Sequence, residues 1–203
     1  MRRIATDRMG LNSMAGKIRT FIAIDLPDHV LHGIGSVQTG LKRTDLKIKW
    51  VRLASMHLTL KFLGDIPSDR IEVIGTALKE TVKGIGPFVL EGKAVGVFPD
   101  LRRPRVVWAG VCGELEALHG LYERLEQALE DIGFPKEKRR VRAHLTIGRI
   151  KGRVKKQVLR AAVEGGKDFL TDPFDVASVI LYQSTLRPQG AVYTKLVEAE
   201  LMG

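Results

Sequence analysis

Hydrophobic and polar residues follow one another along the chain in a pattern that predicts alternating strands and helices. An apolar run predicts a strand over 19–26, and a three-to-four-residue spacing predicts a helix over Asp28–Lys42. Strict alternation over residues 56–63 (MHLTLKFL) predicts a strand with one buried face. A helix over 69–83, capped by Ser68, and an extended segment over Phe88–Phe98 complete this first series.

The series then starts again in the second half of the chain. It predicts a strand over 105–111, a helix over 114–131 ended by Gly133 and Pro135, a strand over 142–150 and a helix over 154–164. Two long strands are expected over 174–185 and 191–199, separated by a turn that contains Pro188 and Gly190.

Short sequence matches between the two halves indicate an internal duplication. Residues 31–33 (LHG) recur at 118–120 and residues 57–60 (HLTL) recur as HLTI at 144–147, both 87 positions later, and Pro87-Phe88 recurs as Pro173-Phe174 after 86. The shared offset and element order predict an α+β fold of two lobes related by a pseudo-two-fold axis, each a variation on split β-α-β packing. Two mainly antiparallel sheets are expected to face a central groove, with the helices outside.

The duplication also sets the expected domain organisation. Residues 18–203 are expected to form a single bilobal domain with pseudo-repeats over about 19–98 and 104–200. Residues 1–17 lack periodicity, so we expect a disordered leader there and regard Met14 as an alternative start.

Composition narrows the class of protein. The chain has 203 residues, of which 44% are hydrophobic and 28% charged, which is typical of a globular domain and excludes disorder as the main state. No apolar run approaches the roughly 18–20 residues of a membrane-spanning helix, and no secretory signal is visible, so a cytoplasmic protein is expected. A single cysteine, Cys112, excludes an internal disulfide and a thiolate zinc cluster.

The net charge of +10 is concentrated in one segment. Residues 136–160 carry 11 lysines and arginines against one acid, Glu137, and the remainder of the chain sums to zero. Such a segment favours a polyanionic partner, most simply a nucleic acid. The alternative is a solvated basic face that serves solubility.

Two His-x-Thr triplets occupy equivalent positions in the repeats, where composition alone predicts about 0.3 by chance. Residues two apart on a strand share a face, so His57 and Thr59 are expected to face the groove, as are His144 and Thr146. The alternation places residues 58, 60 and 62 (Leu58, Leu60 and Phe62) in the core, with Leu145 and Ile147 as their counterparts. Lys61 and Arg142 share the parity of the histidines and are expected to border the groove.

Two facing imidazoles suit phosphodiester chemistry without a metal. A neutral imidazole accepts a proton and a protonated one donates it, and the unperturbed pKa of histidine, about 6.5, permits both states at neutral pH. Threonine hydroxyls can donate to phosphate oxygens. The other histidines, His29, His32 and His119, fall on predicted helices or helix starts, where a packing role is expected. The absence of an HD pair or H-x-H argues against a metallophosphodiesterase, and no cofactor is expected.

At these residues the chain resembles the 2H phosphoesterase superfamily, and more narrowly the RNA 2′,3′-cyclic phosphodiesterases, also called 2′-5′ RNA ligases. The resemblance covers about residues 18–200. It rests on FIAIDLP at 21–27, Trp50-Val51, HLTLKFLG at 57–64, Phe98-Pro99, PRVVWAG at 104–110, HLTIGR at 144–149, and the run Ser184, Leu186, Pro188, Gly190 and Tyr193. Ala143 departs from the family, which usually has proline before the second histidine.

The resemblance implies hydrolysis of a terminal RNA 2′,3′-cyclic phosphate to a 2′-phosphomonoester. It implies His57 as proton donor to the departing 3′ oxygen, His144 as the acceptor that activates water, and Thr59 and Thr146 as phosphate-binding residues. Arg149 falls on the family's basic position after the second histidine. Strand parity alone would put Arg149 on the face opposite His144, unless the strand ends or bulges near Gly148.

The partners implied are RNAs with cyclic phosphate ends, such as tRNA-derived ends, and no obligate protein partner is expected. One alternative function is a non-catalytic module that binds RNA ends, and another is a phosphodiesterase for small cyclic nucleotides. ATP-dependent ligation is disfavoured because no G-x-x-x-x-G-K-[ST] loop is present. Ligation would be the cyclic-phosphate opening in reverse, with a 5′-hydroxyl in place of water.

Overall fold

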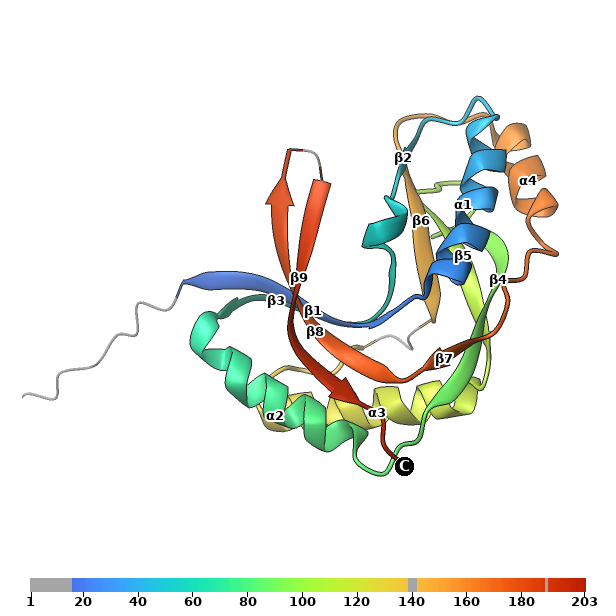
Figure 1. Cartoon of the computed structure of the whole chain (residues 1–203). Coiled ribbons are helices and arrows are strands. Elements are labelled where there is room, and N and C mark those ends of the chain that lie inside the picture. Colours follow the sequence, from blue (N-terminus) through green and yellow to red (C-terminus); the bar gives the residue numbers. More distant parts are fainter. Residues whose placement is uncertain (1–15, 139–141, 189) are drawn as a thin grey trace, which may run out of the picture.

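A computed structural model describes residues 16–138, 142–188 and 190–203, which form two antiparallel sheets set at an angle to each other (Figure 1). The four-stranded sheet has the order β3 (His57–Pro67), β1 (Lys17–Asp25), β8 (Ser178–Arg187), β9 (Gly190–Glu200). The five-stranded sheet has the order β2 (Ile48–Trp50), β6 (His144–Ile150), β5 (Val106–Gly113), β4 (Phe88–Phe98), β7 (Phe174–Val176). The predicted α+β class with two facing sheets is confirmed.

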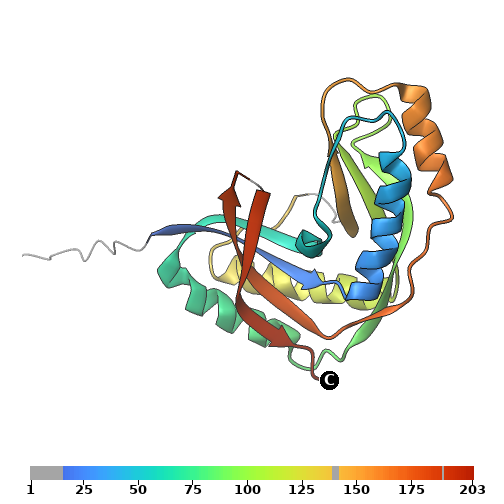
Figure 2. The same cartoon turned by 45° about the horizontal axis from the view of Figure 1, so that its top comes forward.

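The helices lie on the outer sides of the sheets. Helices α2 (Ile71–Val82) and α3 (Leu115–Asp131) lie side by side against the four-stranded sheet, whereas α1 (Asp28–Lys42) and α4 (Lys156–Gly165) flank the five-stranded sheet (Figures 1 and 2). The sequence of α3 explains why it packs against a sheet. Its buried leucines recur every three or four residues, at 118, 121, 125 and 129, and so lie on one face of the helix. Among the described residues, no helix is long and apolar enough to cross a membrane.

The two sheets do not coincide with the two sequence repeats. The pairs β3-β1 and β6-β5 occupy corresponding places, but β8 and β9 of the second repeat complete the first sheet, and β2 and β4 of the first repeat lie in the second. Helix α1, which follows β1, likewise packs behind β6, where Gln38 bonds to the Ile147 carbonyl. A hydrophobic pattern determines which face of a strand is buried but not which strand lies beside it, so the sequence did not reveal this exchange.

Several element boundaries differ from the sequence predictions. Ser68 does not cap a helix, because it begins a 3₁₀ turn, Ser68–Arg70, and neither that turn nor α2 has a side-chain cap. The strand expected over 174–185 is two strands, because the chain passes from one sheet to the other at Ala177. Strand β2 was not predicted, since three residues are too few to show a period. The expected leader lies almost entirely outside the described residues.

Both histidine-bearing strands contain a β-bulge at the same repeat position. In β3 the register against β1 passes from Ala23–Thr59 to Ile22–Lys61, which leaves Leu60 as an extra residue. In β6 the register against β5 passes from Trp108–Thr146 to Val107–Gly148, which leaves Ile147 as the extra residue, 87 positions after Leu60. A bulge reverses the alternation beyond it. Residues 61 and 148 (Lys61 and Gly148) therefore turn toward the core, and residues 62 and 149 (Phe62 and Arg149) turn away from it.

Candidate active site

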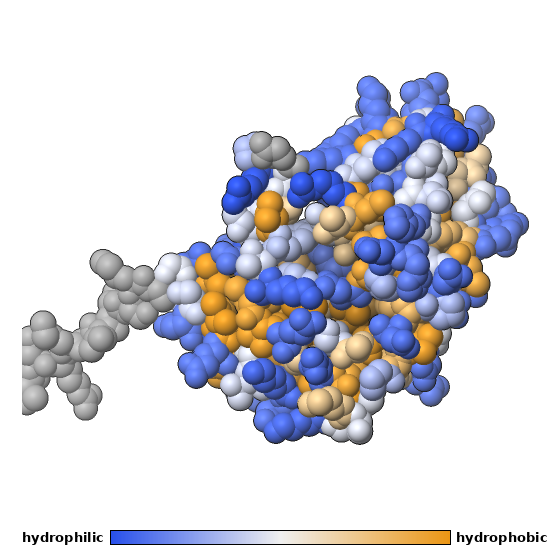
Figure 3. Space-filling model, in the orientation of Figure 1, coloured by the Kyte–Doolittle hydropathy of each residue, from blue (hydrophilic) through white to orange (hydrophobic). Residues whose placement is uncertain are grey.

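A cavity of about 430 Å³ lies where the two sheets meet, and its lining includes all five site residues that the sequence indicated. These are His57, Thr59, His144, Thr146 and Arg149. The strands that carry them, β3 and β6, are in direct contact with each other. Figure 3 shows the surface hollowed between the β8–β9 hairpin and the five-stranded sheet, with hydrophilic and hydrophobic residues meeting at the rim. The volume is in the range of small-molecule sites, about 300–1,000 Å³.

His57 lies against an aromatic cluster on the groove side of the four-stranded sheet. Its ring stacks on Phe21 with the centroids 4.6 Å apart, and the Tyr193 ring lies nearly perpendicular to it with the centroids 5.1 Å apart. Burial lowers the pKa of His57 to about 4, although the nearby Asp25 carboxylate and a backbone hydrogen bond with Ser55 oppose this shift. In the absence of a ligand, His57 is therefore neutral at pH 7.

His144 is held by a hydrogen bond to the backbone two residues before it. Its Nδ1 lies 2.7 Å from the carbonyl oxygen of Arg142. A carbonyl oxygen only accepts, so Nδ1 carries the proton and donates, which leaves Nε2 free to exchange a proton with a substrate. His57 has the equivalent backbone bond, to Ser55, so the repeat reproduces both the histidine and its orienting contact. The His144 and Phe98 rings are perpendicular to each other, with the centroids 5.0 Å apart.

The bulge at Ile147 brings Arg149 into the cavity and so resolves the conflict with strand parity. The carbonyl oxygen of Ile147 accepts hydrogen bonds from Gln38 Nε2 at 2.9 Å and from the Val51 backbone at 3.2 Å. Gln38 is buried and also donates to the Val51 carbonyl at 2.8 Å. The inward-turned residue, Gly148, has no room for a side chain, because a Cβ there would lie 2.5 Å from Ile48 Cγ2.

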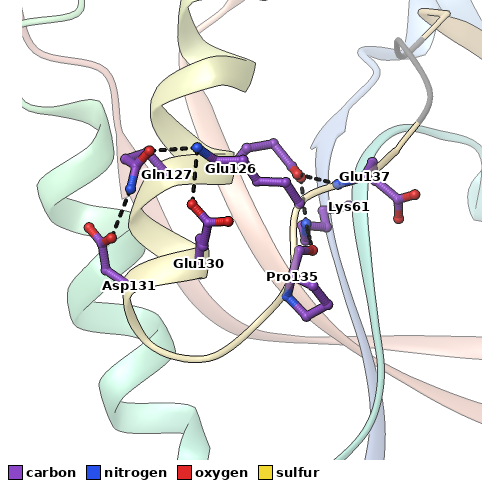
Figure 4. A network of polar contacts seen from close by, with 8 residues as sticks. Lys61, Glu126, Gln127, Glu130, Asp131, Pro135 and Glu137 are labelled. Atoms are coloured by element: carbon purple, nitrogen blue, oxygen red, sulfur yellow. Dashed lines mark hydrogen bonds and ion pairs between the residues drawn. The ribbon is translucent and has the colours of Figure 1, made fainter.

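The corresponding bulge in β3 contradicts the predictions for Lys61 and Phe62. Lys61 does not border the groove: its side chain is buried and its Nζ contacts Glu126 Oε1 at 2.6 Å and the Pro135 carbonyl at 2.8 Å (Figure 4). Phe62 is not in the core: it is 62% exposed and lines the cavity. Both predictions assumed unbroken alternation. The Arg142 side chain is exposed and does not line the cavity.

The lining of the cavity is strongly cationic. It contains five basic side chains and, among the described residues, no carboxylate; the basic residues are Arg19, Lys49, Arg52, Arg149 and Lys151. Lys49 lies directly opposite Arg149 in the β2–β6 pair. Like charges in that relation destabilise a sheet unless an anion lies between them. The lining is therefore suited to a phosphate group.

Several cavity residues were not assigned to a site from the sequence. Strand β2 contributes Lys49 and Trp50, and the β8–β9 hairpin contributes Ser184, Leu186 and Tyr193. The sequence did contain a signal for them, since Trp50 and the hairpin residues are among the residues on which the family resemblance rests.

The remaining candidates lie elsewhere. Of the basic segment 136–160, Arg149 and Lys151 line the cavity, whereas Arg139 and Arg140 lie outside the described residues. The other histidines lie on α1 and α3, outside the cavity. No three His, Cys, Asp or Glu side chains gather as a metal site within the part of the chain that the structure describes.

Comparison of the sequence with protein families and curated proteins finds consistent matches. The family model "LigT like Phosphoesterase" matches residues 24–108 and 113–193. An RNA 2′,3′-cyclic phosphodiesterase of Methanothermobacter thermautotrophicus is 33% identical over 180 residues, covering 89% of this chain and 97% of that protein. The protein of the same name from Aquifex aeolicus is 39% identical over 171 residues, covering 80% of this chain and 87% of that protein.

Comparison of the fold with solved structures agrees. The structure of TT0787 from Thermus thermophilus superposes with a TM-score of 0.76 at 25% identity, covering 91% of this chain and 98% of that chain. Escherichia coli LigT, in a complex with 3′-AMP, superposes with a TM-score of 0.73 at 23% identity, covering 92% of this chain and 99% of that chain. The two-sheet fold of this chain is therefore shared with these proteins.

Proposed function

The chain belongs to the LigT-like phosphoesterase family, and on that basis we propose that it hydrolyses the terminal 2′,3′-cyclic phosphate of an RNA to a 2′-phosphomonoester. The observation that carries the proposal is one cavity lined by two imidazoles, two threonine hydroxyls and five cations, without a carboxylate among its described residues. The relatives named as RNA 2′,3′-cyclic phosphodiesterases support the same substrate.

In the proposed reaction the two histidines move one proton each. His144 accepts a proton from water at Nε2, and the water oxygen bonds to phosphorus. The bond from phosphorus to the 3′ oxygen breaks, and His57 donates a proton to that oxygen. The contact between His144 Nδ1 and the Arg142 carbonyl supports this role, because it keeps the opposite nitrogen available.

The other three residues stabilise the charge on phosphorus. The hydroxyls of Thr59 and Thr146 donate to non-bridging oxygens, and the Arg149 guanidinium pairs with the negative charge that grows in the transition state. The step needs no electron transfer and no activated cofactor, so we propose a metal-independent reaction.

The donor role of His57 requires the substrate to change its protonation. Burial holds the pKa of His57 at about 4 in the free protein, which leaves little imidazolium at pH 7. An anionic phosphate beside the ring favours the charged form and raises that pKa. We therefore propose that His57 takes up its proton together with the substrate.

The biological setting follows from the same chemistry. We propose a cytoplasmic enzyme that acts on RNA fragments, including tRNA-derived fragments with cyclic phosphate ends. The reverse reaction, with an RNA 5′-hydroxyl in place of water, would join two RNAs through a 2′-5′ linkage.

The test is hydrolysis of a short RNA with a terminal 2′,3′-cyclic phosphate in excess EDTA, with the product compared to 2′- and 3′-phosphate standards. His57→Ala and His144→Ala are each expected to lower turnover by at least about 100-fold, the usual contribution of a positioned acid or base. His32→Ala is the matched control, because His32 is an exposed histidine outside the cavity. Full activity in either cavity variant, or a requirement for metal, would overturn the proposal.

A further inference from the structure

We propose that Asp25 is a positioning residue that gives the role of proton donor to His57 rather than to His144. Its carboxylate favours the charged imidazole at one of two histidines that the repeats otherwise place alike. The inference rests on the proposed function, because it assumes that one histidine gives a proton and the other accepts one. Asp25 does not line the cavity, so it acts on the reaction through His57 and not by contact with the phosphate.

Most contacts of the two histidines are the same in both repeats. Each histidine lies two residues before a threonine and three residues before the extra residue of a bulge. Each also has a hydrogen bond with the backbone of the residue two positions before it, Ser55 or Arg142. Since these contacts are shared, they do not decide which imidazole gives a proton and which accepts one.

The residues directly opposite the two histidines differ. Asp25 lies opposite His57 in the β1–β3 pair, and Gly110 lies opposite His144 in the β5–β6 pair. Opposite residues of antiparallel strands share a face with their Cβ atoms about 4.5–5.5 Å apart, so Asp25 places its side chain beside His57. Gly110 has no room for a counterpart, because a Cβ there would lie 2.8 Å from the Lys93 carbonyl oxygen.

Two side chains from β8 and β9 hold the Asp25 carboxylate in place. The Tyr182 hydroxyl donates a hydrogen bond to Oδ1, and Lys195 Nζ lies 3.0 Å from Oδ2. Burial and the bond to Asp25 raise the pKa of Tyr182, and the bond to Asp25 raises the pKa of Lys195. Both groups therefore keep their protons at neutral pH and continue to hold the carboxylate.

The five-stranded sheet lacks this hydroxyl as well as the carboxylate. Tyr182 pairs with the β1 residue four positions before Asp25. Phe98 pairs with the β5 residue four positions before Gly110, so Phe98 occupies the corresponding place. A phenyl ring has no hydroxyl to donate, and this one lies against the His144 ring. The arrangement that holds a carboxylate beside His57 is therefore not repeated at these places beside His144.

The other groups around His57 do not replace the carboxylate. The titratable or charged side chains that surround the ring, besides Asp25, are Tyr182, Tyr193, Lys195, the five basic residues of the cavity lining and His144 across the cavity. None of these side chains is a carboxylate, and Glu198 lies beyond Lys195, 3.5 Å from its Nζ. Burial lowers the pKa of His57 to about 4, and the Asp25 carboxylate opposes this shift.

The size of the effect follows from the protonation of His57. An opposite charge close to a titratable group shifts its pKa by about 1–3 units, and the Asp25 side chain is 45% exposed, so the low end applies. While His57 is mostly neutral, one unit changes its imidazolium fraction about 10-fold. Removal of the Asp25 charge is therefore expected to slow proton donation about 10-fold and to leave the activation of water by His144 unchanged.

The experiment compares two leaving groups. One substrate is a short RNA with a terminal 2′,3′-cyclic phosphate, and the other has sulfur in place of its 3′ oxygen. A thiol has a pKa of about 8.5, far below that of an alcohol, so the thiolate leaves without a donated proton. At pH 7 Asp25→Asn should lower the single-turnover rate about 10-fold for the oxygen substrate and less than about 2-fold for the sulfur substrate.

Two further variants keep the charge or move the change elsewhere. Asp25→Glu retains a carboxylate and should recover most of the rate on the oxygen substrate. Asp175→Asn is the matched control, because it makes the same charge change at an exposed position of β7 outside the cavity. It should leave both rates unchanged.

The pH dependence gives a readout that a loss of folding would not reproduce. For the oxygen substrate, the limb of the pH–rate profile that belongs to His57 should move to lower pH in Asp25→Asn. Lys195→Met removes the cation that partly neutralises Asp25, so it should move the same limb to higher pH. The sulfur substrate should show the His144 limb alone. Shifts in the same direction in both variants would overturn the inference.

The histidine variants separate this inference from the proposed function. The proposed function requires His57→Ala to slow the oxygen substrate far more than the sulfur substrate, and His144→Ala to slow both. If that pattern is found but Asp25→Asn slows both substrates equally, or neither, the inference alone is wrong. If His57→Ala slows both equally, or the unaltered protein hydrolyses neither substrate, the proposed function fails and the inference fails with it.

Discussion

The side-chain amide of Gln38 donates to the carbonyl oxygen of Ile147 across 2.9 Å, so a helix behind the sheet holds the bulge that points Arg149 into the cavity. The bond joins residues 109 positions apart, and both groups are buried. Gln38 does not line the cavity itself. Its influence on phosphate binding is therefore expected to pass through the backbone, at Ile147 in β6 and at Val51, whose carbonyl also accepts from Gln38.

Gln38→Leu is expected to lower both stability and substrate affinity. The variant leaves the Val51 carbonyl without its buried donor, and a lost buried partner costs about 1–3 kcal/mol of the free energy of unfolding. With the bulge less firmly held, Arg149 is less well placed against the phosphate, so KM should rise and kcat should fall. Urea denaturation and steady-state kinetics measure the two effects. Thr39→Ala, at an exposed α1 position, should change neither, and a stability loss in Gln38→Leu with an unchanged KM would contradict the role of the bulge.

Gly148→Ala is expected to destabilise the protein, whereas Gly120→Ala should stabilise it. An alanine Cβ at position 148 would lie 2.5 Å from Ile48 Cγ2, so β2 or β6 has to shift, at a cost of about 1–3 kcal/mol. At Gly120 a Cβ meets nothing within 4 Å, and the residue lies within α3, where alanine is favoured over glycine by about 1 kcal/mol. Thermal unfolding of both variants checks the opposite signs. A Gly148→Ala protein as stable as the original would show that the β2–β6 pair adapts freely.

Lys61→Met is expected to be among the more destabilising substitutions outside the apolar core. Lys61 and Glu126 are 3% and 6% exposed at their side chains, and Glu126 also accepts a hydrogen bond from the Glu137 backbone at 2.7 Å. Removing one partner of a buried pair costs about 3–5 kcal/mol, because the remaining charge is left in the interior.

A double variant tests that explanation. Lys61→Met/Glu126→Gln removes both charges and keeps an acceptor for Glu137, so its free energy of unfolding should exceed that of Lys61→Met alone. Lys83→Met breaks an exposed pair with Glu80 and should cost less than about 1 kcal/mol. A double variant no more stable than Lys61→Met would mean that lost packing, not the stranded carboxylate, causes the effect.

The sequence predicted the positions of the paired histidines and threonines better than it predicted the positions of the residues around them. His57, Thr59, His144 and Thr146 precede the bulges, so simple alternation placed them correctly in one groove. The same alternation failed one residue past each bulge, at Lys61 and Phe62, because an extra residue changes the facing of the strand without changing its composition. For Arg149, the possibility of a bulge near Gly148 was visible because glycine is common where a strand is irregular.

The fold was predictable as a set of elements and less so as a topology. Helix α1 and strand β4 have their predicted limits, since each has a clear period and a clear end. The pairing of β8 with β1 was not predictable, because strands of either repeat present the same apolar face. The sequence also did not predict the passage from one sheet to the other at Ala177, because apolar residues continue through this position without a turn signal.

The stability of the protein is expected to fall in mildly acidic solution because of His57. Burial lowers the pKa of His57 from 6.5 to about 4, so between these values the folded protein binds fewer protons than the unfolded chain. The free energy of unfolding therefore rises with pH across this window. As the pH falls from 6.5 to 4, the protein loses the contribution of His57, which is about 3 kcal/mol. Urea denaturation from pH 4 to pH 7 measures the change.

His57→Gln supplies the comparison, because it removes the titration and keeps a polar side chain of similar size. Its stability should depend less on pH within the same window than that of the unaltered protein. Direct titration of the imidazole by NMR should give a pKa near 4 in the free protein and a higher one in saturating inorganic phosphate. A free-protein value near 6.5 would mean that the partial burial of this ring does not lower its pKa, and would remove the reason for coupling protonation to substrate binding.

The exchange of β4 and β8 between the sheets means that the connection between the repeats, from Phe98 to Val106, joins two pieces that already interlock. In this respect the chain has the topology of a domain-swapped dimer whose two halves are joined: each half supplies two strands of the other half's sheet. A chain cut within that connection would yield two fragments that have no complete sheet apart and can regain the cavity only by recombining. Each half-chain would carry one histidine, so activity in such a mixture would report on reassembly itself.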